Sequence, residues 1–228
     1  GVAGLRGKVP PMLDLAPTVT QNACLQRSAG AASVAMVRSA EGRTRLKDLA
    51  QKGCAKAMLP RVHGPDPEVV FLNTAGGLTG GDRLSYALAL GPGTRATAAT
   101  QTAERAYRSA GGAGEVSVEL DLGAAARLDW LPQETILFDG SATARRTKVR
   151  MTDDATLLWA ETLVIGRAAM GETLSQVSLR DARQVRRGGA LALWEPLTLA
   201  PAALDHPACV AGARAISTPR TATRARSV

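Results

Sequence analysis

The middle of the chain alternates apolar and polar residues with a period of two. In residues 116–122 (VSVELDL), valine and leucine are separated by serine, glutamate and aspartate. Successive side chains of a β-strand point to opposite faces, so this pattern predicts a strand with one buried face. Strand-like runs recur in pairs, each joined by a short polar or Gly-rich turn, at 84–90 with 95–100, 116–122 with 128–130, 147–152 with 157–165, and 177–186 with 191–194. Four hairpin-like units at short spacing predict a mainly β protein.

Helical patterns are few. Residues 101–108 are compatible with two helical turns, and the Ala-rich residues 207–216 with a late helix. No alternation of strands with helices occurs, which argues against a doubly wound sheet. Pro10, Pro11 and Pro17 indicate a loose arm over 1–23, and the basic residues 217–228 predict a disordered tail. One β domain over 24–216 remains.

Composition restricts the class of protein. The 228 residues carry a net charge of +8, which calls for an acidic partner. Nucleic acid is disfavoured, because two Phe, two Tyr and three Trp offer few stacking platforms. With so few aromatics, Trp130, Trp159 and Trp194 are expected to be the largest pieces of the core. Three scattered cysteines, no long apolar run and no signal-like start predict a cytoplasmic protein without a membrane span.

The densest glycine segment is 73–82 (NTAGGLTGGD). A P-loop needs Lys and Ser or Thr after its last glycine, and Asp82 and Arg83 follow here instead. The paired glycines, Gly76 with Gly77 and Gly80 with Gly81, therefore indicate a structural turn that reaches positive φ.

Soft metal ligands are sparse. The two histidines, His63 and His206, lie far apart, and neither Cys-x-x-Cys nor His-Glu-x-x-His occurs, which argues against a closed zinc or nickel site. Carboxylates near glycines or strand ends are more numerous: Asp82, Glu104, Glu134, Asp139, Glu161 and Glu172. No Gly-x-Ser-x-Gly elbow is present, so catalysis would need two carboxylates that meet in space.

Five ordered segments together resemble the urease accessory protein UreD (UreH) family, and the likeness covers roughly residues 25–215. They are 42–62 (GRTRLKDLAQKGCAKAMLPRV), 72–84 (LNTAGGLTGGDRL), 100–109 (TQTAERAYRS), 131–141 (LPQETILFDGS) and 165–172 (IGRAAMGE). The resemblance implies a β-helix-like fold of stacked strands and hairpins with very few short helices. It also implies a scaffold without turnover of its own. Such a scaffold binds UreF and, through it, the GTPase UreG on urease apoprotein, and nickel moves to the urease active site through an internal, water-filled channel.

A conduit must hold Ni²⁺ weakly, which oxygen ligands with retained water allow. Our hypothesis places four carboxylates on or near this path, Asp82 and Glu172 first, then Glu134 and Asp139, with no tightly bound cofactor. We expect Arg105, Tyr107 and Arg167, with Gly76, Gly77, Gly80 and Gly81, to be structural or partner-facing. Two alternatives stay open: a β-scaffold hydrolase with paired carboxylates, and a basic nucleic-acid-binding protein.

Overall fold

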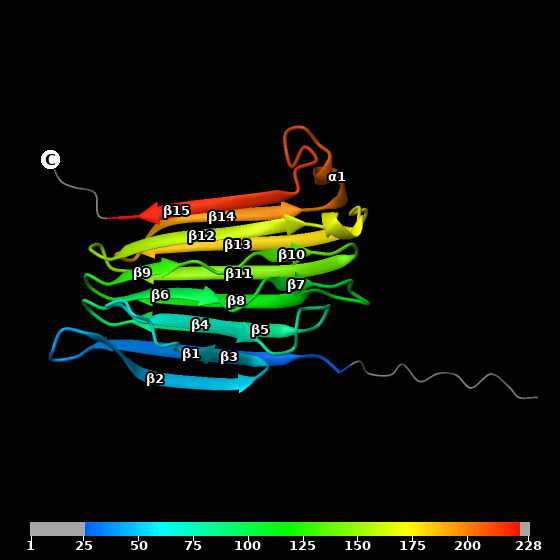
Figure 1. The fold of residues 1–228 in the computed structure, drawn as a ribbon. Coiled ribbons are helices and arrows are strands. Elements are labelled where there is room, and N and C mark those ends of the chain that lie inside the picture. The colour runs from blue at the N-terminus through cyan, green and yellow to red at the C-terminus, as the bar shows by residue number, and fades with distance from the viewer. Residues whose placement is uncertain (1–25, 224–228) are drawn as a thin grey trace, which may run out of the picture.

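The computed structural model describes residues 26–223, which form two stacked β-sheets (Figure 1). Sheet A has the strand order β14 (Ala190–Leu199), β13 (Val177–Arg187), β11 (Ser141–Met151), β8 (Gly114–Leu122), β5 (Arg83–Leu90), β1 (Ala29–Arg38) and β2 (Thr44–Gly53). Sheet B has the order β3 (Ala55–Met58), β4 (Glu68–Asn73), β6 (Arg95–Thr100), β9 (Arg127–Trp130), β12 (Thr156–Ile165), β10 (Thr135–Leu137) and β7 (Glu104–Ala106), with β15 (Ala215–Ala222) paired to β12.

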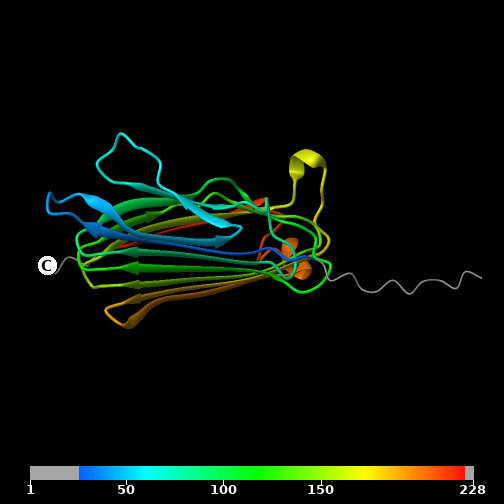
Figure 2. The same ribbon diagram turned by 90° about the horizontal axis from the view of Figure 1, so that it is seen from below.

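Most consecutive strands are joined by arches rather than hairpins. The chain passes from sheet A to sheet B between β5 and β6, β8 and β9, and β11 and β12, and each strand then pairs in parallel with its equivalent in the next turn (Figure 2). Three of the four predicted hairpins are therefore wrong, and only β13 and β14 form an antiparallel pair as expected. Arches and hairpins use the same turn residues. A hairpin keeps its two strands in one sheet, whereas an arch places them in opposite sheets, with the apolar face of each strand pointing into the shared interior. The mainly β, β-helix-like fold is confirmed.

The inward faces of the two sheets form the core. Tyr86 and Leu120 of sheet A meet Phe71, Trp130 and Trp159 of sheet B, all buried. Phe71 anchors this contact, because its ring centroid lies 5.0 Å from that of Tyr86 and 6.1 Å from that of Trp130. A second cluster fills the end of the stack near β13 and β14. The third large aromatic behaves differently from the prediction, since Trp194 is 56% exposed.

Antiparallel strands flank the parallel stack. β2 and β14 close the two edges of sheet A, β3 closes one edge of sheet B, and β15 runs antiparallel along β12. The predicted disordered tail is therefore wrong for residues 217–222, which belong to β15. Pro219 is tolerated there because β15 pairs on one side only. The predicted arm, 1–23, and residues 224–228 lie outside the described residues.

Both helical predictions are wrong. Residues 104–106 form β7, which pairs in parallel with β10, and residues 207–214 form turns. Strand pairing has overridden the weak helical propensity of residues 104–106. The helices that the described residues do contain are the 3₁₀ turn η1 (Ala168–Met170) and the short α1 (Pro201–Leu204). No helix between residues 26 and 223 is long and apolar enough to cross a bilayer.

Candidate functional site

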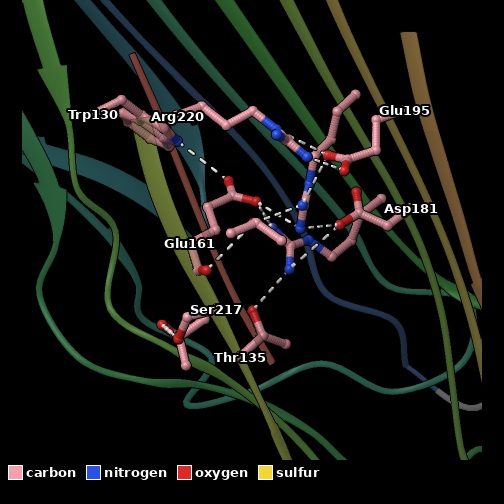
Figure 3. A network of polar contacts seen from close by, with 11 residues as sticks. Trp130, Thr135, Glu161, Asp181, Glu195, Ser217 and Arg220 are labelled. Atoms are coloured by element: carbon pink, nitrogen blue, oxygen red, sulfur yellow. Dashed lines mark hydrogen bonds and ion pairs between the residues drawn. The ribbon is translucent and has the colours of Figure 1, made fainter. Parts of the chain in front are cut away.

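Four charged side chains are buried between the two sheets (Figure 3). Arg145 of β11, with Asp181 and Arg183 of β13, points inward from sheet A, and Glu161 points inward from β12 of sheet B. Their side chains are 10%, 0%, 3% and 3% exposed in that order. Arg145 and Asp181 are register partners, so the topology alone brings these opposite charges side by side.

The ion pairs of this cluster are close and mutual. Arg145 Nη2 lies 2.8 Å from Glu161 Oε2, and Arg183 Nη2 lies 2.8 Å from Asp181 Oδ2 and 3.3 Å from Glu161 Oε2. Burial by itself would lower the pKa of Arg145, but Glu161 and Asp181 outweigh burial and raise it. Arg145 therefore stays charged inside the protein.

Residues from β14 and β15 extend the cluster toward the surface. Glu195 accepts hydrogen bonds from Arg183 Nη1 at 3.3 Å and from Arg220 Nε at 3.3 Å, and Thr218 Oγ1 accepts one from Arg183 Nη1 at 2.7 Å. We call the six ionic residues Arg145, Glu161, Asp181, Arg183, Glu195 and Arg220 the inter-sheet charge network. It contains three guanidiniums and three carboxylates and is electrically balanced.

A small cavity of about 50 Å³ lies beside the network, between the sheets. Its volume suits one or a few water molecules. Polar side chains form much of its wall: Thr100, Glu104, Gln133, Thr135, Thr143, Arg145, Glu161 and Thr162. A second cavity of about 20 Å³ shares Tyr86, Thr100 and Glu104 with the first. Glu104 therefore lines both spaces.

Glu104 differs from the carboxylates of the network because it makes no ion pair with any residue between 26 and 223. Its Oε1 accepts a hydrogen bond from Asn73 Nδ2 at 3.2 Å. Burial raises the pKa of Glu104, and the Asn73 hydrogen bond and the charge of Arg145 oppose this only in part. Glu104 belongs to β7, which the parallel pairing with β10 holds in place.

The four carboxylates of the nickel hypothesis lie in two kinds of place. Asp82 is buried and accepts the backbone N–H groups of Ser28 at 2.7 Å and Thr79 at 2.9 Å, so it closes the glycine turn. Glu134 is half-buried, and its backbone oxygen accepts the N–H of Glu104 at 2.9 Å. Neither side chain lines the two interior cavities.

Asp139 and Glu172 do lie together, in the turns that follow β10 and η1, where the Asp139 N–H donates to Glu172 Oε1 at 3.3 Å. Both are already paired with arginine, Asp139 with Arg108 and Glu172 with Arg167. Hydrogen bonds from the backbone N–H groups of residues 176 and 175 lower the Asp139 pKa to about 2, and the Arg167 hydrogen bond lowers that of Glu172. No group of three or more His, Cys, Asp or Glu that could hold a metal ion is found in the described part of the chain. The metal role of these four residues stays a prediction.

The glycines and their neighbours form a packed corner. A Cβ at Gly77 would lie 2.3 Å from Tyr107 Cε2, and one at Gly80 would lie 2.1 Å from Ser109 Oγ. Gly76 and Gly81 have φ values of 81° and 89°, which other residues rarely adopt.

The aromatic residues of the same corner stack on one another. Tyr107 packs edge-on against Phe138, with ring centroids 5.1 Å apart, and the Arg167 guanidinium lies 4.2 Å from the Phe138 centroid. Arg167 directly precedes η1, which lies in the yellow loop that stands out in Figure 2. Tyr107 is 39% exposed and Arg105 is also exposed. A structural part is therefore clear for Gly77 and Gly80, whereas contact with a partner stays a prediction.

Comparison with known proteins identifies the family. The family model described as UreD urease accessory protein matches residues 28–224. The chain belongs to the UreD family. It is 70% identical over 194 residues to a urease accessory protein UreD of Dinoroseobacter shibae, covering 85% of this chain and 69% of that protein. It is 57% identical over 198 residues to a UreD of Cereibacter sphaeroides (86% and 72%), and 47% identical over 210 residues to one of Paracoccus denitrificans (91% and 72%).

Proposed function

We propose that this UreD protein acts in urease maturation as a cytoplasmic scaffold without turnover. In this proposal it joins UreF, UreG through UreF, and urease apoprotein, and Ni²⁺ passes through its interior toward the urease active site. The family supports the maturation role. The observation that carries the route for nickel is the pair of polar cavities that meet at Glu104.

Three properties of the interior favour weak binding of a divalent cation. Glu104 offers a carboxylate with no arginine on it, and the neighbouring threonine and glutamine side chains offer neutral polar oxygens. Asp181 Oδ1 and Arg183 Nε are buried and make no hydrogen bond to another described residue, which is typical of groups that hold buried water. A few oxygens with retained water suit an ion in transit, because a cluster of imidazoles or thiolates would retain it.

Glu104→Gln tests this route, because it removes the charge and keeps the acceptor for Asn73. The variant is co-expressed with urease, UreF and UreG, and nickel per urease active site is measured by mass spectrometry beside urease activity. We expect nickel occupancy to fall at least about tenfold while the complex still assembles. Glu41→Gln changes an exposed carboxylate in the same way and should load nickel normally. Normal loading by Glu104→Gln would overturn the route.

A stability control separates loss of transport from loss of fold. Because burial raises the Glu104 pKa, the ionised form is less stable in the folded protein, and stability is lost as pH rises through that raised pKa. Glu104→Gln lacks this penalty, so it should unfold at a higher temperature than the parent at pH 7 and at a similar temperature at pH 4. Asp139→Asn and Glu172→Gln extend the test to the carboxylates predicted from the sequence.

A further inference from the structure

The outer face of sheet A carries a groove of about 710 Å³ that the core does not use. Its floor consists of small residues that stand side by side in register, Ala31 of β1 with Ser85 of β5 and Ser117 of β8. A flat floor of Ala and Ser allows the backbone or side chains of another protein to approach closely. Lys52, Arg83, Glu115 and Arg146 form the charged walls.

Unneutralised positive charge continues from this groove across β11 and β13. Arg146, Arg180 and Arg186 are exposed, occupy outward positions and make no ion pair with any described residue. The three β8 acids of the same face already pair with Arg83 and Arg150. Asp48 of β2, the register partner of Ala35, adds one acid against the three unpaired arginines. The surplus on this face is therefore basic.

An exposed aromatic borders the basic surface. Trp194 of β14 is the register partner of Gln184, which pairs in turn with Lys148 of β11, so these side chains share the outer face. Trp194 is 56% exposed and Leu191, next to Arg186, is 54% exposed. Tryptophan and arginine at the same surface are the residue types that dominate binding energy at protein interfaces.

We propose that the outer face of sheet A docks an acidic protein segment. Its carboxylates would meet Arg146, Arg180 and Arg186, its small side chains would lie on the groove floor, and an apolar residue would cover Trp194. Among the described residues this face offers one aromatic, Trp194, for base stacking, which favours a protein segment over nucleic acid. The choice of UreF and urease apoprotein as the partners to test rests on the proposed function.

Charge reversal tests the surface. Arg146→Glu, Arg180→Glu and Arg186→Glu are combined, and Trp194→Ala is made separately. The matched control combines Arg43→Glu, Arg61→Glu and Arg95→Glu, three exposed arginines that lie in the β1–β2 turn, in the loop between β3 and β4, and on β6 of sheet B. Purified UreF and urease apoprotein serve as separate probes in a surface binding assay. We expect the face variants to bind one probe at least about tenfold more weakly and the control to stay within about twofold. Unchanged binding of both probes to both face variants would overturn the proposal.

Crosslinking identifies the occupant. A photo-crosslinking residue replaces Ser117 in the groove floor, the complex is irradiated, and the crosslinked peptide is sequenced. A partner peptide rich in Asp and Glu supports the proposal, whereas a nucleic acid, a second copy of this chain, a basic peptide or no crosslink contradicts it. Glu104→Gln should assemble normally but load at least about tenfold less nickel, whereas the face variants should bind one partner at least about tenfold more weakly, so the two proposals can fail separately.

Discussion

The inter-sheet charge network allows the effect of burial on an ion pair to be measured. Glu161→Gln changes a buried pair and is compared with a substitution in an exposed pair. Glu161 Oε2 lies 2.8 Å from Arg145 Nη2 and 3.3 Å from Arg183 Nη2, while its Oε1 accepts the Trp130 indole N–H at 3.3 Å. Glutamine keeps the size of the side chain and an oxygen for Trp130. It removes the nearest carboxylate of Arg145, which then has only Asp181 at 4.0 Å, and it removes one of the three carboxylates around Arg183. The Glu161 side chain in this site is 3% exposed.

The magnitude follows from that exposure. Leaving a buried charge without its partner costs about 3–5 kcal/mol. Glu119→Gln provides the comparison, because Glu119 lies 3.1 Å from Arg150 with its side chain 43% exposed, and Arg150 keeps Asp121. Solvent screens such a pair, and its loss costs about 0–1 kcal/mol. The two pairs have similar N–O distances, so their difference in cost reports burial.

Thermal and urea unfolding, followed by tryptophan fluorescence and circular dichroism, measure both variants. At about 2–4 °C per kcal/mol for a chain of this size, Glu161→Gln should lower Tm by roughly 6–20 °C and Glu119→Gln by less than about 4 °C. The double variant Arg145→Met with Glu161→Met should recover much of the loss, because apolar groups of similar volume replace the charges. Equal small shifts for Glu161→Gln and Glu119→Gln would refute the reasoning.

Two further predictions concern Asp139 and the glycine at the end of β2. The Asp139 pKa is lowered from 3.8 to about 2, so its contribution to stability is present above about pH 4 and is lost as pH falls toward 2; the stability gap between the parent and Asp139→Asn in urea should narrow over that range. Gly53→Ala places a Cβ 1.9 Å from Ala29 O at φ +61°, whereas Gly189→Ala at φ +83° meets open space. The second should cost about 1–2 kcal/mol and the first clearly more, and comparable losses in urea unfolding would contradict the steric argument.

Alternation along the chain predicts strands well but does not predict which strands pair. The alternation in residues 116–122 indicates that one face of a strand is buried. That condition is met by β8, which leads into an arch, and would equally be met by a strand of a hairpin. The distinction depends on long-range parallel contacts between β5, β8 and β11, which no local pattern contains. The prediction of a disordered tail fails for a related reason. β15 is stabilised by pairing with β12 and by the ion pair between Arg220 and Glu195, and both partners are remote from β15 in the sequence.

Arg145 and Asp181, two of the interior charges, have a signal in the sequence that the nickel hypothesis does not use. Arg145 stands in phase with Thr143, Thr147 and Val149, and Asp181 stands in phase with Leu179 and Val185, so each interrupts a buried face. The nickel hypothesis instead uses acids near glycines or strand ends. Glycines mark the turns at the ends of strands, where Asp139 and Glu172 form ion pairs with arginine. The interior polar residues lie within strands instead.

Balance of charge determines where a cation can rest in the interior. Three guanidiniums already neutralise the three carboxylates of the inter-sheet charge network, and the 50 Å³ cavity is lined by Arg145 and Glu161 but not by Asp181, Arg183 or Glu195. A divalent cation in that cavity would be drawn to Glu104 and repelled by Arg145. On the proposed route, the polar path would end at the network in this conformation, and nickel would pass only if Arg145 exchanged Glu161 for another partner. The ion pair between Arg145 and Glu161 would then be the barrier to the proposed transport as well as a stabilising contact of the fold.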